Sequence, residues 1–229
     1  MCRSIRRIFF IISIFFPSLM SAQAVNDAGL WVSFNLEKKL NKRFGVFLTE
    51  EYRRKENLTQ TNLLYTEIGM SFKPYGFMKV SLSYRSIQKY EKEEVFTFRH
   101  RVTMDMVFKK KIGKVTSSYR ERVQMQVNDI NTSEFGNIPV WSARQKMELK
   151  YDLNNAIKPF VSVEGRFQFQ NPKNAELGYS WNRIRYTGGF DCKMNEMNTF
   201  ALYYVIQNSF NVSVPRNYYQ IGVSYTLSL

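Results

Sequence analysis

The feature that most restricts the fold of this 229-residue chain is a recurring alternation of apolar and polar residues. From Tyr219 to Leu229, apolar residues occupy every odd position, and polar residues or glycine occupy the even positions. A period of two is typical of a β-strand with one apolar face. The same pattern marks ten upstream segments, residues 30–37, 44–48, 64–72, 78–84, 96–108, 115–125, 141–151, 161–169, 184–192 and 200–206. The sequence therefore predicts an all-β chain.

The connections between these segments alternate in length. They are short after odd-numbered segments, as at Lys39–Arg43 and Lys73–Phe77, and longer after even-numbered ones, as at Asn128–Pro139 and Asn171–Tyr179. Transmembrane β-barrels combine short periplasmic turns with longer outer loops. We therefore predict an antiparallel up-and-down transmembrane β-barrel of about 10–12 strands, in one domain covering residues 25–229.

Eleven segments conflict with the even strand number that is normal for single-chain bacterial barrels. Two explanations remain open at this point. In the first, Val25–Leu40 threads the lumen or lies at the rim instead of forming part of the wall. In the second, one strand has been missed or one has been divided in two.

Residues 1–24 have the pattern of a cleaved signal peptide. Three arginines within residues 3–7 precede the apolar run Ile8–Phe16, and Ala22-Gln23-Ala24 fits the small-x-small cleavage rule. The run is too short for a transmembrane helix, which needs about 20 residues. A buried first helix is the alternative. Cleavage would leave Cys192 as the single cysteine, so no disulfide could form within the mature chain.

Alternation alone does not decide which face of a barrel points outward. A soluble barrel has its apolar side chains inside, whereas a membrane barrel has them outside. The export signal, the alternating connection lengths and the terminal strand favour the membrane barrel. The main alternative is a soluble periplasmic barrel that binds an apolar ligand inside.

In a membrane barrel, the polar face lines the lumen, and here that face is densely charged. Its Lys and Arg residues outnumber its Asp and Glu residues by 12 to 6. Two interpretations remain open, a structural network of ion pairs and water, or a narrow conduit or binding site for a small anionic solute. The predicted lumen-lining charges are Glu51, Arg53, Glu67, Lys79, Arg85, Arg99, Arg101, Asp105, Arg120, Arg122, Arg144, Lys146, Glu148, Glu164, Arg166, Arg183, Arg185 and Asp191.

No catalytic, cofactor-binding or metal-binding residues are predicted. Outer-membrane lipid hydrolases use a serine and a histidine, but the single histidine, His100, shares the parity of Phe98 and Val102 and is expected to face lipid. A lipid-modifying barrel enzyme remains an alternative of another class. Although the chain is basic and aromatic-rich, an exported protein is not expected to meet cytoplasmic nucleic acid.

The terminal strand carries a short assembly motif. Gln220, Gly222, Tyr225 and Leu227 follow the order polar-x-Gly-x-x-aromatic-x-apolar. This order resembles the β-signal by which the barrel-assembly machinery recognises outer-membrane proteins. The chain departs from it by ending in Leu229, where many such proteins end in Phe or Trp. The resemblance implies that the assembly machinery and outer-membrane lipid are partners of this protein.

Several further segments resemble one family. They are Asp27–Phe34 near the predicted mature N-terminus, Glu50–Arg53, Ser83–Arg85 and Gly222–Tyr225. Together they are similar to the domain-of-unknown-function 2490 family over essentially the whole mature chain. The resemblance implies an exported β-barrel in the outer membrane of Gram-negative bacteria. It implies no activity.

The terminal strand also leads to a test of assembly. We expect the double variant Tyr225→Asp and Leu227→Asp to fail in barrel closure and to be degraded in the periplasm. The strand must present apolar side chains to the assembly machinery and then to lipid, where a charged side chain is costly. Immunoblotting of outer-membrane fractions measures the outcome, and a normal level of the double variant would contradict the assignment of this strand.

Overall fold

The computed structural model describes residues 25–90, 96–128, 138–169, 180–212 and 214–229, and the predicted signal peptide lies outside them. No helix in these ranges is long and apolar enough to cross a membrane. The described ranges form eleven strands: β1 (Val25–Lys39), β2 (Phe44–Lys55), β3 (Gln60–Tyr75), β4 (Met78–Tyr90), β5 (Phe96–Ile112), β6 (Val115–Val127), β7 (Val140–Tyr151), β8 (Ile157–Gln168), β9 (Ser180–Lys193), β10 (Asn198–Ser209) and β11 (Arg216–Ser228).

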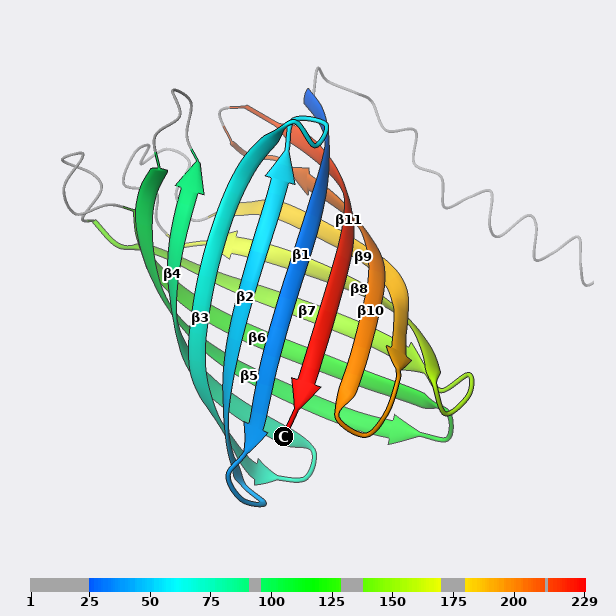
Figure 1. The fold of residues 1–229 in the computed structure, drawn as a ribbon. Helices are drawn as coiled ribbons and strands as arrows, with labels where there is room; N and C mark the ends of the chain where they lie inside the picture. Colours follow the sequence, from blue (N-terminus) through cyan, green and yellow to red (C-terminus); the bar gives the residue numbers. More distant parts are fainter. Residues whose placement is uncertain (1–24, 91–95, 129–137, 170–179, 213) are drawn as a thin grey trace, which may run out of the picture.

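The strands form one closed barrel (Figure 1). Each strand pairs with its neighbours in the chain in antiparallel fashion, and β1 pairs with β11 to complete the circle. The predicted all-β barrel is confirmed, and eleven described strands lie within the expected range of 10–12. The alternation predicted every strand because each one has an outward and an inward face.

Neither explanation of the odd strand number is correct. β1 lies in the wall, hydrogen-bonded to β2 on one side and β11 on the other, so residues 25–39 do not thread the lumen. All eleven segments are separate strands. An odd number of hairpin-linked strands leaves the first and last running in the same direction. The ladder between β1 and β11 is therefore parallel. The antiparallel arrangement that we predicted for the barrel is corrected for this one ladder, which we call the seam.

The connections divide the barrel into two different ends. At one end, the turns are short, such as residues 76–77 between β3 and β4 and residues 113–114 between β5 and β6. At the other end, the strands are separated by the two longest intervals in the sequence, residues 128–139 after β6 and residues 169–179 after β8. β1 begins at this long-loop end, and β11 ends beside the short turns (Figure 1).

The two faces of the wall have opposite character. On β5, Met104 is 50% exposed on the outer surface, whereas the adjacent Thr103 is 1% exposed and points inward. The described interior buries many more polar and charged side chains than apolar ones. A barrel that holds an apolar ligand inside would need the reverse arrangement, so the structure argues against that alternative.

Glycines allow one aromatic side chain to lie close to the inner wall. Tyr203 on β10 has Gly222 of β11 and Gly189 of β9 as its register partners. A Cβ atom at Gly222 would overlap the Tyr203 ring, and one at Gly189 would lie 2.7 Å from the Tyr203 Cα atom. Gly222 of the terminal motif thus has a packing role in addition to its predicted role in assembly.

The parallel seam can be tested by disulfide cross-linking on a Cys192→Ser background. We expect the pairs Leu30→Cys with Ile221→Cys and Phe34→Cys with Tyr225→Cys to cross-link, because each pair is in register. An antiparallel seam centred on the same residues would instead join position 30 to position 225. Gel mobility after mild oxidation distinguishes the two, and cross-linking of Leu30→Cys with Tyr225→Cys alone would contradict the parallel pairing.

Candidate functional site

Two cavities lie inside the barrel formed by the described residues. The one nearer the short turns has a volume of about 530 Å³ and a lining of both charges, including Asp105, Lys146 and Asp191. We call it the mixed-charge cavity. The one nearer the long connections, the arginine cavity, has a volume of about 440 Å³. Its described lining contains nine cations and no Asp or Glu. These cations are Arg53, Arg85, Lys89, Arg99, Arg101, Arg144, Arg183, Arg185 and Arg216.

The structure brings together the charged residues that the sequence placed on the lumen face. Seventeen of the eighteen line one of the two cavities. The remaining one, Arg166, lies between its register partners Arg144 and Arg183, which both line the arginine cavity. What these charges do is still a prediction, which the geometry below develops.

A septum of side chains separates the two cavities. Arg53 and Arg185 lie over the ring of Trp31, with guanidinium carbons 3.8 and 5.0 Å from its centroid. Arg85 lies 3.7 Å from the centroid of Tyr65. Such cation–π contacts hold guanidinium groups over aromatic faces. The residues that line both cavities, and so form the septum, are Trp31, Arg53, Tyr65, Arg85, Arg144 and Arg185.

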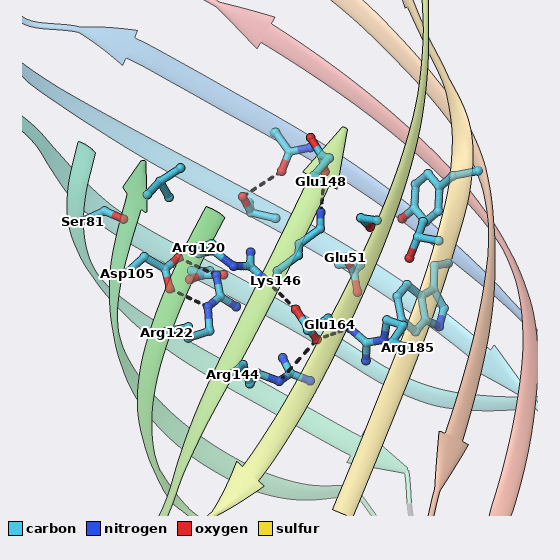
Figure 2. Close-up of a pocket in the computed structure, with 18 of the residues that line it drawn as sticks. Glu51, Ser81, Asp105, Arg120, Arg122, Arg144, Lys146, Glu148, Glu164 and Arg185 are labelled. Atoms are coloured by element: carbon cyan, nitrogen blue, oxygen red, sulfur yellow. Dashed lines mark hydrogen bonds and ion pairs between the residues drawn. The ribbon is translucent and has the colours of Figure 1, made fainter. Parts of the chain in front are cut away.

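Glu164 on β8 anchors one side of the septum. Its carboxylate is 2.5 Å from Arg120 Nη2 and 3.1 Å from Arg185 Nη1. Arg144 Nε is 3.6 Å from the same group. Figure 2 shows the three guanidinium groups converging on this one carboxylate, which is only 5% exposed. Glu164 therefore compensates charges from β6, β7 and β9 at once.

Two further carboxylates anchor the opposite side. Tyr65 Oη donates a hydrogen bond of 3.0 Å to Glu51 Oε2. Glu67 accepts hydrogen bonds from Ser83 Oγ at 2.5 Å and from Arg85 Nε at 3.0 Å. Because these groups satisfy one another, this part of the interior has the character of a structural network.

A row of arginines crosses four neighbouring strands. Arg122 is opposite Arg144, which is opposite Arg166, which is opposite Arg183. Arg122 donates two hydrogen bonds of 2.6 Å to Asp105. Within the described chain, Arg166 and Arg183 form no ion pair, and their Nε atoms are buried without a hydrogen-bond partner. Like charges directly opposite one another destabilise a sheet, so this row is a site of unbalanced positive charge.

Among the described residues of the outer surface, His100 contacts a tyrosine and not a serine. Nδ1 of His100 is 2.6 Å from Tyr84 Oη, and the two rings stack. Ser86 is the register partner of His100, but the described structure contains no hydrogen bond between them. A serine nucleophile needs its base within hydrogen-bond reach. The described residues also contain no group of three or more His, Cys, Asp or Glu side chains that could hold a metal ion.

The predicted lumen-lining residues did not include the uncharged members of the site, nor the charged lining residues Glu37, Lys89, Lys150 and Arg216. Trp31 and Tyr65 form the aromatic part of the septum, and Gln207 accepts a hydrogen bond of 2.7 Å from Arg185 Nη2. The alternation of β1 could have identified Trp31, because this residue lies on the polar face of its strand. Glu121 was not predicted either, and it lies outside this site. It is a charged residue on the outer face, because it shares the parity of the outward-facing Tyr119 and Val123.

An apolar outer surface around a charged interior defines the class of this protein, a β-barrel of the membrane-spanning type. Residues 28–218 match the family described as "Protein of unknown function (DUF2490)", and the chain belongs to that family. The family resemblance seen in the sequence is thereby confirmed.

Two solved structures share the fold. The NanC porin has 12% sequence identity and a TM-score of 0.55, and the match covers 88% of this chain and 99% of that one. The beta domain of the Bordetella autotransporter BrkA has 10% identity and a TM-score of 0.50, with coverage of 81% and 82%. No curated protein sequence matches the chain.

The Glu164 cluster leads to a prediction about stability. We expect Glu164→Gln to lower the free energy of unfolding by about 3–5 kcal/mol, because it leaves buried arginines without their counter-charge. Urea unfolding of the refolded barrel in detergent micelles measures this change. Glu196→Gln is the control, since the Glu196 side chain is 93% exposed and its loss should cost at most about 0.5 kcal/mol. Equal losses in the two variants would show that Glu164 is not a structural anchor.

Proposed function

We propose that this protein is an outer-membrane β-barrel that binds a small anionic solute in its arginine cavity and is closed below that cavity by the septum. The observation that carries the proposal is the described lining of the arginine cavity, with nine cations and no carboxylate. Guanidinium groups suit this role because each can donate two parallel hydrogen bonds to a carboxylate or phosphate.

The contrast with the mixed-charge cavity supports this assignment. There, Glu148 pairs with Lys146 at 2.6 Å, and Asp191 pairs with Lys150. Those charges compensate one another, so they are well explained as structural. Arg183 lines the arginine cavity and Arg166 is its register partner, and neither charge has such a partner among the described residues. An exogenous anion would supply it.

The septum determines how far such a solute can travel. Its arginines are held by Glu164, Glu51 and the rings of Trp31 and Tyr65. A solute could pass only by displacing arginines from these partners. The proposed binding site is therefore open toward the long-loop end, and the septum closes the lumen between this site and the short turns.

The proposed location rests on the outer surface. Large apolar side chains are exposed around the barrel, as hydrocarbon requires, and long loops normally face the exterior of a Gram-negative outer membrane. The fold shared with a porin and an autotransporter domain supports this location, as does the predicted signal peptide. Outer-membrane lipid and the assembly machinery are then its expected partners.

Calorimetric titration of the detergent-solubilised barrel with inorganic phosphate at low salt tests the proposal. We expect binding that weakens at least roughly ten-fold in the double variant Arg101→Gln and Arg183→Gln, because charge-assisted hydrogen bonds are lost. Lys146→Gln is the control, since Lys146 lies in the other cavity beside Glu148. Absence of binding by the wild-type barrel, or equal binding by the double variant, would overturn the proposal.

A further inference from the structure

A dense group of cations lies at the short-turn end, away from the arginine cavity. It consists of residues 38–43, Lys73 and residues 109–114, which we call the basic rim. These segments contain nine Lys or Arg residues and no Asp or Glu, and all nine are exposed. Within the described chain, Lys111 is the one member with an ion pair, to Asp152 at 2.6 Å. The rim therefore presents a large uncompensated positive charge.

Backbone hydrogen bonds join the turns of the rim into one ordered surface. The Lys73 amide donates to the Arg43 carbonyl at 2.8 Å, which links the first turn to the second. The Lys109 amide donates to the Phe77 carbonyl at 2.8 Å and links the second turn to the third. In Figure 1 the turns after β1 and β3 lie side by side at the lower end of the barrel, and the turn after β5 lies at the lower right. Their cations are thus held in a continuous arc from β1 to β6.

Apolar side chains are interspersed with these cations. Leu40 is 59% exposed and Ile112 is 66% exposed. Tyr75 and Phe77 are 62% and 56% exposed, and their rings stack with centroids 5.5 Å apart. Exposed aromatic and aliphatic groups mixed with lysine are characteristic of a membrane–water interface.

Outward-facing side chains change character where two strands reach the rim. On β1, the outward-facing row runs from Phe34 through Leu36 to Lys38, and on β5 it runs from Met106 through Phe108 to Lys110. Each row changes from apolar to cationic at the end of its strand. Lipid phosphates lie at this level, so the lysines are positioned to meet them.

We propose that the basic rim binds the phosphate groups of anionic phospholipids in the periplasmic leaflet of the outer membrane. The outward register and the exposed apolar turns favour a lipid over an acidic protein. Short turns face the periplasm in barrels of this type, which selects that leaflet. The inference shares the membrane orientation of the proposed function but uses different residues and a different ligand.

The experiment uses the full-length barrel reconstituted in phosphatidylcholine bilayers with spin-labelled lipids. We expect spin-labelled phosphatidylglycerol to associate several-fold more strongly than spin-labelled phosphatidylcholine at low salt. The preference should decline toward one in 1 M salt, where the screening length falls to about 3 Å. Equal association of the two lipids with the wild-type barrel at low salt would overturn the proposal.

Two matched variants locate the effect. The rim variant, which should lose the preference, carries Lys42→Gln, Arg43→Gln, Lys110→Gln and Lys114→Gln. The control, which should keep it, removes four cations at the long-loop end through Arg54→Gln, Lys55→Gln, Lys89→Gln and Arg216→Gln. Retention of the preference by the folded rim variant would overturn the assignment, and the wild-type salt dependence is a test that does not depend on any variant.

The leaflet is tested separately in cells. An Asn41→Cys variant on the Cys192→Ser background should react with a membrane-impermeant thiol reagent only after the outer membrane is permeabilised. The Cys192→Ser parent alone is the control. Labelling in intact cells would place the rim outside and overturn the periplasmic-leaflet assignment. Failure of phosphate to bind the arginine cavity would leave these outcomes unchanged.

Discussion

Closure of the sheet is the constraint on which the rest of this structure depends. Hydrocarbon offers no water to satisfy backbone amides and carbonyls, so a membrane-spanning sheet must have no free edge. Hairpin connections reverse the chain at each step, and eleven strands leave β1 and β11 running in the same direction. The barrel closes with a parallel ladder over thirteen register pairs, although parallel pairing is slightly less stable per residue. Leaving two edges unpaired would cost much more.

Closure also determines where charge can be placed. Side chains that point away from lipid must fit into one enclosed space, where each ion needs a partner or water. At mid-height, the partners are provided by Glu164, Glu51 and Glu67 together with two aromatic rings. Toward the long loops, carboxylates are absent from the described lining. Among the described residues, cations without a carboxylate partner thus lie toward the two ends of the barrel, and the cations between them are balanced.

The sequence was sufficient to predict every strand and most of the charged residues that line the interior, because both follow from a period of two. It was not sufficient to predict the parallel seam, since alternation looks the same whichever way a strand runs. The septum could not be predicted from the sequence either. Parity places Trp31 and Arg185 on the inner face, but their contact across the lumen depends on the tilt and stagger of the strands. Interactions between distant strands therefore need the structure.

Glu121 shows what the outer face of such a wall can tolerate. Arg120 and Arg122 point into the lumen, so the residue between them must point outward. Its carboxylate accepts hydrogen bonds from Tyr119 Oη at 2.7 Å and from Gln145 Nε2 at 2.9 Å. Carboxylates cost less on a lipid-facing surface than Lys or Arg, and neighbouring donors reduce that cost further. The remaining penalty lies on Gln145, whose Oε1 atom is buried without a partner. An outward position can thus hold a charged group whose hydrogen bonds neighbouring side chains supply, which explains how Glu121 interrupts the apolar face of β6 without displacing the strand from the wall.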